Sequence, residues 1–386
     1  MKIKTLRTKA IIFSLSLLYG QQNGGTYLIN LISPNLIPFK YNLETNQWSD
    51  ALNATNPGGD DNCEITYDSE NRKIIAVTNQ NNNLFADIYS PDDDTWEQGS
   101  SISTSGGLDY DEGLCYDSES NKVILIAHTS NATKPFIYDT QNNIWDEGEN
   151  YGGGLHAESA VAYDSESDVV IYFKWVGSVQ NIGAYSYDYN NNQWNQKSGS
   201  THSGSLNDFG VTYDSESDRI VLVKSVNNYL IVRSYDYNSD SWSDDFTDFN
   251  VNDGVTEIDV TYDEKNDLSI VTVRNSDSEN IRTFTYDLNT DTWTQKQSLD
   301  AGSSNYWVDL VYVDGYSKWH VSTTGSNNNA GSEESPFATI QHGINASSDG
   351  DTVLVQAGTY YENISLNGKS IHLFGQNRET TIIDAG

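Results

Sequence analysis

The stretch Tyr138-Asp-Thr-Gln-Asn-Asn-Ile-Trp145 decides the fold, because its spacing of a tyrosine and a tryptophan seven residues later recurs along the chain. The six copies are Tyr41/Trp48, Tyr89/Trp96, Tyr138/Trp145, Tyr187/Trp194, Tyr235/Trp242 and Tyr286/Trp293. Successive tryptophans lie 48, 49, 49, 48 and 51 residues apart. A fixed period of this length indicates a repeat architecture, in which every repeat is one supersecondary unit.

Each repeat predicts four short strands. In the first full repeat, Glu64–Tyr67 and Leu84–Tyr89 alternate, Lys73–Val77 is an apolar run, and Thr95–Glu97 carries the tryptophan. A second marker follows strand one: Tyr-Asp-Ser-Glu begins at residues 67, 116, 163 and 213, and Tyr-Asp-Glu begins at 262. Aspartates in such turns bond their own backbone, which predicts turn formers rather than catalysts. These aspartates are Asp68, Asp117, Asp164, Asp214 and Asp263.

The two ends of the repeat region complete one another. Residues 26–50 contain strands two to four of a repeat and lack strand one. A copy of strand one, Leu310–Tyr312, appears fifty residues after Tyr262 without a tryptophan strand of its own. The chain is therefore predicted to be all-β, with a six-bladed β-propeller of four-stranded blades whose last blade is closed by both ends. Closure removes the exposed sheet edges that invite aggregation.

The repeated tryptophans have two interpretations, a packing role in every blade or a set of sugar-stacking platforms. One tryptophan per blade at a fixed position favours packing, because a tryptophan buries a large area and repeated packing needs it at the same place.

Residues 26–314 resemble the kelch-repeat family in blade length, in the Tyr-x6-Trp spacing and in the apolar second strand. The chain departs from that family where the second strand should end in a glycine pair. The corresponding places read Thr78-Asn79, His128-Thr129 and Lys224-Ser225.

The pattern changes after Asp314. A helix is expected to begin at Ser335-Pro336, with Ser335 as its cap and with Phe337, Ile340 and Ile344 on one face. Short strands are expected at Trp319–Ser322, Thr352–Val355, Glu362–Ile364, Ser370–Phe374 and Thr380–Ile383.

Residues 318–386 resemble the start of a right-handed parallel β-helix of the pectin-lyase-like kind. The matching residues are Pro336-Phe-Ala-Thr-Ile-Gln341, Gly350-Asp-Thr-Val-Leu-Val355, Ala357-Gly-Thr-Tyr360, Glu362-Asn-Ile364 and Thr380-Thr-Ile-Ile-Asp384. The resemblance implies a capping helix and the first coils of a stack whose chemistry lies on later coils. Because stacked neighbours supply the core of such a fold, we expect the sequence to be the N-terminal part of a longer protein.

Residues 1–20 are typical of a secretory signal peptide, with a basic Met1 to Lys9, an apolar Ala10 to Tyr19 and the small residue Gly20. The apolar run is too short to span a bilayer comfortably, so we expect a secreted or cell-surface protein without a transmembrane segment. Cys63 and Cys115, the two cysteines, sit at different places in their repeats, which favours unpaired thiols over a disulfide.

The chain is strongly acidic, with a net charge of -34, and removal of the leader leaves 17 basic residues against 55 acidic ones. Such a chain repels nucleic acid and anionic membranes. The six histidines show no metal-ligand spacing, and no catalytic constellation or cofactor motif is recognisable in the sequence.

One place in the repeat carries candidate ligands. Five residues before each marker tyrosine lie Asn62, Asp111, Glu158, Asp208, Glu257 and Trp307. The four carboxylates, Asp111, Glu158, Asp208 and Glu257, would enter the innermost strands near the central channel. Converging carboxylates suit a hard cation such as calcium. A solvated acidic rim is the alternative.

Two functions follow from these features, and a third, a propeller enzyme, would need a metal or acid/base constellation that the sequence does not show. The first is a secreted or cell-surface binding or adhesion protein that recognises a glycan or a protein through propeller loops. The alternative is an extracellular carbohydrate-active enzyme of the pectin lyase or esterase kind, with its active site on later β-helix coils. The alternative depends on fold analogy.

Overall fold

The computed structural model describes residues 25–32, 35–49, 62–91, 94–104, 113–129, 132–152, 159–176, 181–201, 206–252, 254–275, 280–300, 307–313, 318–329, 331–332, 335–348, 351–369, 371–378 and 380–384. The chain folds into two compact units: a propeller over residues 25–314 and a C-terminal unit that begins at residue 315. The leader predicted at residues 1–20 lies outside the described residues. Within the described residues, no helix has the length and apolar character needed to cross a membrane.

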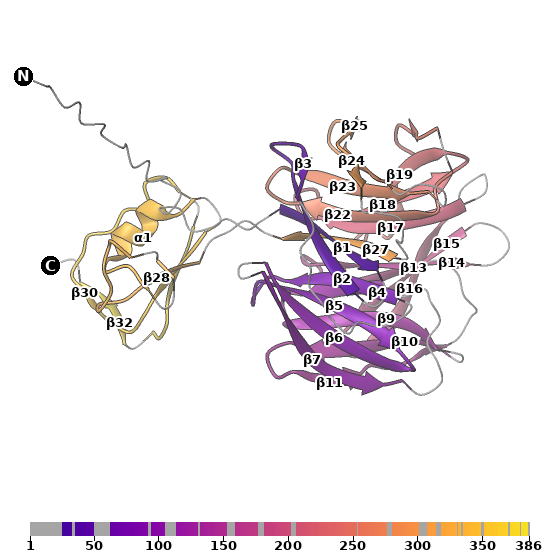
Figure 1. Ribbon diagram of the computed structural model, residues 1–386. Coiled ribbons are helices and arrows are strands. Elements are labelled where there is room, and N and C mark those ends of the chain that lie inside the picture. The colour runs from indigo at the N-terminus through magenta and orange to yellow at the C-terminus, as the bar shows by residue number, and fades with distance from the viewer. Residues whose placement is uncertain are drawn as a thin grey trace, which may run out of the picture. The chain divides into compact units, whose positions relative to one another are not determined.

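The propeller consists of six antiparallel sheets that follow one another around a ring (Figure 1). The closing blade is ordered β27 (Trp307–Val313), β1 (Gly25–Ile32), β2 (Asn35–Asn42), β3 (Gln47–Trp48). Blade 1 contains β4 (Asn62–Asp68), β5 (Lys73–Gln80), β6 (Asn83–Ser90) and β7 (Thr95–Ser103). Blade 2 contains β8 (Gly113–Asp117), β9 (Lys122–Thr129), β10 (Ala132–Asp139) and β11 (Ile144–Glu147), with β12 (Tyr151–Gly152) also paired to β10.

The remaining three blades repeat this plan. Blade 3 contains β13 (Ser159–Asp164), β14 (Val169–Val176), β15 (Asn181–Asp188) and β16 (Gln193–Thr201). Blade 4 contains β17 (Leu206–Asp214), β18 (Arg219–Val226), β19 (Tyr229–Asp236) and β20 (Ser241–Trp242), with β21 (Phe249–Asn250) beside β19. Blade 5 contains β22 (Glu257–Asp263), β23 (Leu268–Arg274), β24 (Asn280–Asp287) and β25 (Thr292–Gln295), with β26 (Leu299–Asp300) beside β24.

Ring closure is confirmed by the pairing of the two ends of the propeller. β27 pairs antiparallel with β1, in a register that places Tyr312 opposite Thr26 and Leu310 opposite Leu28. The first strands of the blades then contact one another in an unbroken cycle: β4 with β8, β8 with β13, β13 with β17, β17 with β22, β22 with β27, and β27 with β4. The unit over residues 25–314 is therefore a six-bladed propeller, as the repeat arithmetic predicts.

The hydrophobic core lies between the blades rather than at the centre of the ring. Six apolar clusters each join two neighbouring blades. Alternation along the second strands builds them: in β14, Ile171 and Phe173 face blade 4, while Val170 and Tyr172 face blade 2. Each blade thus buries both of its faces, which explains why the second strands are continuously apolar.

In its described residues the C-terminal unit has two small parallel sheets and one helix. β28 (Lys318–Val321), β29 (Thr352–Val355) and β31 (His372–Gly375) form one sheet, and β30 (Gly358–Tyr360) pairs with β32 (Thr381–Ile383). The helix α1 (Ile340–Ala346) packs against β28 and β29.

Two expectations for this unit are wrong. The helix begins at Ile340 rather than at Pro336, because Phe337 forms a β-bridge with Val321 and the side chain of Thr339 caps the helix. Residues 362–364 form no strand, and the Glu362 carboxylate instead accepts hydrogen bonds from the backbone of Ile340 and Gln341, at 2.8 and 3.0 Å, at the start of α1.

Candidate functional site

In four blades the turn after the first strand is fixed by a hydrogen bond from the marker tyrosine. Its hydroxyl donates to an asparagine or aspartate five residues later: Tyr116 to Asn121 at 2.7 Å, Tyr163 to Asp168 at 2.7 Å, Tyr213 to Asp218 at 3.0 Å and Tyr262 to Asp267 at 2.7 Å. The acceptor residues have φ between 53° and 54°, a left-handed conformation that asparagine and aspartate tolerate best among non-glycine residues. Burial raises the pKa of these tyrosines, so the hydroxyls stay protonated as donors.

The aspartate after each marker tyrosine completes the turn, which confirms its predicted role. Asp117 Oδ1 accepts the backbone N–H of Ser120 at 2.9 Å, and Asp164 and Asp214 accept those of Ser167 and Ser217 at 2.9 and 3.0 Å. All five of these carboxylates are buried: Asp68, Asp117, Asp164, Asp214 and Asp263.

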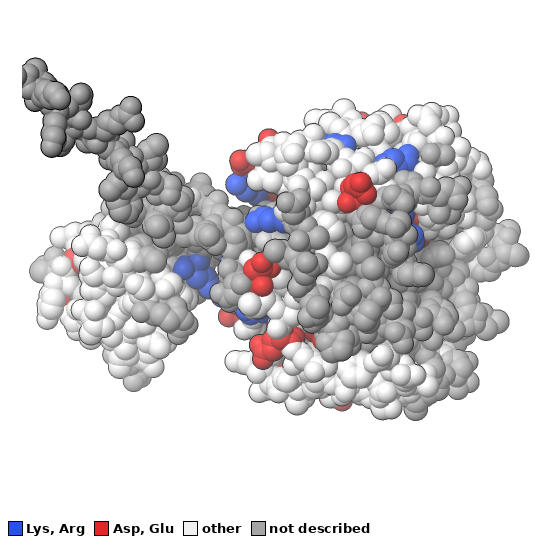
Figure 2. All heavy atoms as spheres, viewed as in Figure 1, with Lys and Arg blue, Asp and Glu red and all other residues white. Residues whose placement is uncertain are grey.

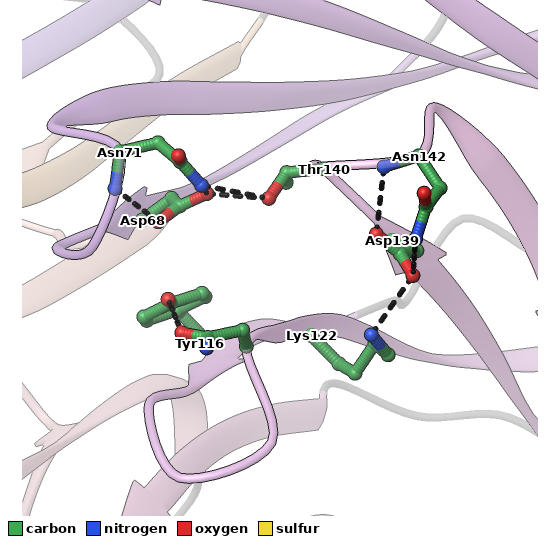
Figure 3. A network of polar contacts seen from close by, with 8 residues as sticks. Asp68, Asn71, Tyr116, Lys122, Asp139, Thr140 and Asn142 are labelled. Atoms are coloured by element: carbon green, nitrogen blue, oxygen red, sulfur yellow. Dashed lines mark hydrogen bonds and ion pairs between the residues drawn. The ribbon is translucent and has the colours of Figure 1, made fainter. Parts of the chain in front are cut away.

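Neighbouring blades are joined through the same turns. Figure 3 shows the turn of Asp68 and Asn71 in blade 1 beside Thr140 of blade 2, whose hydroxyl donates to Asp68 Oδ2 at 2.6 Å. In that figure Asp139 closes the turn that contains Thr140: it accepts from the backbone N–H of Asn142 at 2.9 Å and pairs with Lys122. The turns of blades 1 and 2 therefore form one hydrogen-bonded network rather than two separate loops.

The repeated tryptophans also join blades. Each is half-buried and lies about 5 Å from the ring of its paired tyrosine. Five of the indole N–H groups donate to backbone carbonyls of the preceding blade, at 2.7–3.1 Å: Trp48 to Gln297, Trp145 to Ser100, Trp194 to Glu149, Trp242 to Ser198 and Trp293 to Thr247. The indole N–H of Trp96 is buried without a partner among the described residues. Packing between blades is thus the role that the structure gives to these tryptophans.

A cavity of about 350 Å³ lies where the first strands of all six blades end. Every marker tyrosine lines it: Tyr67, Tyr116, Tyr163, Tyr213, Tyr262 and Tyr312. Strand residues just before them add Thr66, Thr212, Thr261 and several valines, and turn residues Ser69, Ser118, Ser165 and Glu264 line it as well. Ser118, Ser165 and Glu264 are exposed, so the cavity reaches the surface on the face that carries these turns.

The cavity lining is polar and carries little charge. Among the described residues that line it, Glu264 is the one carboxylate, and there is no lysine, arginine or histidine. In the view of Figure 2, the described acidic and basic side chains are scattered among uncharged surface, and some of opposite charge lie side by side. This cavity, built by all six repeats, is the candidate functional site of the propeller.

The predicted cation ring is only partly within the described residues, since Asp111 and Glu158 lie outside them. Asp208 is buried and accepts the backbone N–H of Phe209 at 2.8 Å and that of Ile258 on the next blade. Glu257 pairs with Arg274. In the described part of the chain no group of three histidine, cysteine or acidic side chains is arranged to hold a metal, and the calcium ring stays a prediction.

Three neighbouring first strands carry a carboxylate three residues before the marker tyrosine, namely Glu64, Asp259 and Asp309. Asp309 accepts from Leu310 N at 2.8 Å and from Ile65 N of blade 1. Asp259 accepts from Val260 N at 2.8 Å and shares a hydrogen bond with Asp309. Burial, and then the nearby Asp309, raises the pKa of Asp259 well above its usual range. Burial also raises the pKa of Asp309, but less far, which assigns the proton of the pair to Asp259.

The two cysteines are free and buried, as predicted from their spacing. Cys63 packs between the closing blade and blade 1, and Cys115 packs between blades 2 and 3. Burial raises the pKa of both thiols well above the usual range, so they behave as small apolar groups rather than as nucleophiles.

No family model matches the chain, and no curated protein matches it. Solved structures with a similar fold include the Nidogen/Laminin complex, with TM-score 0.53, 10% identity and coverage of 75% of this chain and 98% of that one. A putative 6-phosphogluconolactonase from Bacteroides uniformis gives TM-score 0.51 at 10% identity, covering 76% and 87%. The periplasmic gluconolactonase of Pseudomonas aeruginosa gives 0.50 at 10%, covering 75% and 100%. At such identities the likeness supports the propeller fold and nothing finer.

Proposed function

We propose that the chain is an exported binding protein that recognises an extracellular glycan or protein through its propeller. The observation that carries this proposal is the cavity of about 350 Å³ that all six blades line and that opens among turns held by hydrogen bonds. Small-molecule sites are typically concave and largely pre-formed, with volumes of roughly 300–1,000 Å³.

The rim of the cavity supports binding because it is organised before any ligand arrives. The Tyr116 hydroxyl is held by Asn121, and Asp117 holds the backbone of Ser120, so the turn has few conformations to lose. A rigid rim lowers the entropy cost of binding.

The test is to apply the purified full chain to an array of extracellular glycans and proteins, and to assay every glycan that binds for newly released reducing ends. Specific binding without release supports the proposal. Release of reducing ends would contradict it and favour the carbohydrate-active enzyme, and an array without any specific binding would also contradict it.

We further propose that the propeller is kelch-like and that residues 318–386 begin a right-handed parallel β-helix. The parallel register of β28, β29 and β31 supports the second proposal, because Val321, Val355 and Gly375 lie in line across the three strands. The proposed binding function also requires export, which we assign to the leader at residues 1–20. Fusing these residues to a reporter enzyme tests this assignment, because the reporter should then be secreted.

A further inference from the structure

We propose that the central cavity binds a neutral, hydroxyl-rich ligand, namely a saccharide unit of one or two rings. The inference rests on the proposed function and deepens it, since it names both the ligand class and the face of the propeller that receives it.

The size of the cavity limits the ligand. Its volume of about 350 Å³ is near the lower end of the range for small-molecule sites. A ligand of one or two sugar rings fits this range, whereas a folded protein segment would need a larger groove. A longer glycan would place only its terminal unit inside.

Hydroxyl groups supply the polar part of the lining. In the described part of the chain, the side chains of Ser69, Ser118 and Ser165 at the mouth, and of Thr66 and Thr212 further in, make no hydrogen bond. A hydroxyl both donates and accepts, so it can pair with a sugar hydroxyl in either direction. Thr261 differs, because its hydroxyl already accepts the backbone N–H of Tyr312 at 2.8 Å.

Apolar surface alternates with these hydroxyls. Val161, Val211 and Val260 lie two residues before their marker tyrosines and line the same cavity. A sugar ring presents hydroxyl groups at its edge and C–H groups on its faces. Such a ligand is matched by a lining of mixed hydroxyl, aromatic and aliphatic groups, which fixes orientation with a few polar contacts.

The charges around the cavity disfavour ionic ligands. An anion would meet no cation among the lining residues that the structure describes, and it would approach a chain of net charge -34. A cation would find one described lining carboxylate, Glu264, which already interacts with another residue. The buried carboxylates of the turns are also occupied: Asp117, for example, accepts from the backbone of both Glu119 and Ser120. A neutral ligand needs no compensating charge.

The experiment measures binding of neutral mono- and disaccharides to the full chain by isothermal titration calorimetry. The probes are glucose, galactose, mannose, xylose, N-acetylglucosamine and their disaccharides, each at up to 20 mM. Glucuronic acid and glucosamine serve as the matched anion and cation. Three variants accompany the wild type: Thr212→Val removes one lining hydroxyl, Ser118→Trp fills the mouth, and Thr95→Val makes the same change on the exposed side of β7. Circular dichroism confirms that each variant is folded.

The inference predicts that at least one neutral saccharide binds, at least tenfold more tightly than its charged analogue. Thr212→Val should weaken binding at least fivefold, Ser118→Trp should abolish it, and Thr95→Val should leave it unchanged. Binding of only the charged probes, or of none, would overturn the ligand class. Saccharide binding that survives Ser118→Trp would overturn the cavity as the site, while leaving the proposed binding function intact.

Discussion

Replacing either member of the carboxyl pair Asp259/Asp309 by asparagine should change the free energy of unfolding, and the two changes should have opposite signs. Asp259 holds a proton that it shares with Asp309 in a hydrogen bond, so Asp259→Asn keeps a donor at the same place and removes the ionisable group. Asp309 accepts two backbone N–H groups, from Leu310 and from Ile65 of the next blade. Asp309→Asn leaves one oxygen for them, and hydrogen bonds to a charged group contribute about 1.5–3 kcal/mol.

The sign of the pH effect follows from the raised pKa of Asp259. As pH rises above the ordinary range of an aspartate, the unfolded chain loses this proton while the folded chain keeps it, so the free energy of unfolding falls. The amide introduced by Asp259→Asn cannot titrate, so the variant escapes this loss. At pH 8 we therefore expect Asp259→Asn to raise the free energy of unfolding by about 1 kcal/mol or more, since a tenfold change in proton affinity corresponds to about 1.4 kcal/mol. At pH 4 the gain should nearly vanish.

Urea denaturation at pH 4, 6 and 8 measures both effects. Asp309→Asn should lower the free energy of unfolding by about 2 kcal/mol at pH 8. Asp248→Asn, an exposed residue of blade 4, removes the same charge as a control and should change stability by less than about 0.5 kcal/mol. Equal effects of Asp259→Asn and Asp309→Asn, or a pH-independent effect of Asp259→Asn, would refute the assignment of the proton.

Three further substitutions test buried contacts inside the propeller. Tyr138→Phe removes the 2.9 Å hydrogen bond to Asn143 and should cost about 1 kcal/mol in urea denaturation, whereas Tyr229→Phe on the surface should cost almost nothing. Gly99→Ala places a methyl group 2.5 Å from the Tyr138 hydroxyl and 2.8 Å from a backbone carbonyl, so we expect a loss of about 1–3 kcal/mol, and an unchanged melting temperature would contradict this geometry. Burial lowers the pKa of Lys174, so Lys174→Met should stabilise the fold by about 1 kcal/mol at pH 7. This gain in the free energy of unfolding should shrink as the pH approaches 10, where the lysine loses its charge in the unfolded chain as well. A gain that stays constant with pH would argue against a buried ammonium group at this position.

The propeller could be predicted from the sequence because its packing is periodic. Every blade needs a tyrosine and a tryptophan at the same depth, and the pairing of Tyr138 with Trp145 across β10 and β11 is what their spacing encodes. Ring closure could be predicted for the same reason, because Leu310–Tyr312 repeats the pattern of a first strand. The Asn or Asp five residues after each tyrosine, such as Asn143, was equally periodic and could have been found by the same comparison of repeats.

Individual hydrogen bonds between blades could not be predicted from the periodicity of the sequence. Asp309 bonds to Ile65, which is 244 residues away in sequence, and only the closed ring brings the two together. The cavity has the same origin, since it exists only where six first strands converge. The start of α1 was misplaced because the bridge between Phe337 and Val321 outweighs the local preference of Ser335-Pro336 for a helix start.

The most direct test of the central claim is a crystal structure of the full chain soaked with the saccharide that binds most tightly in the calorimetric panel. The account predicts that the sugar lies in the central cavity, with its hydroxyls within hydrogen-bond distance of Thr212 and Ser118. A sugar found on the opposite face of the propeller, or on the C-terminal unit, would contradict it.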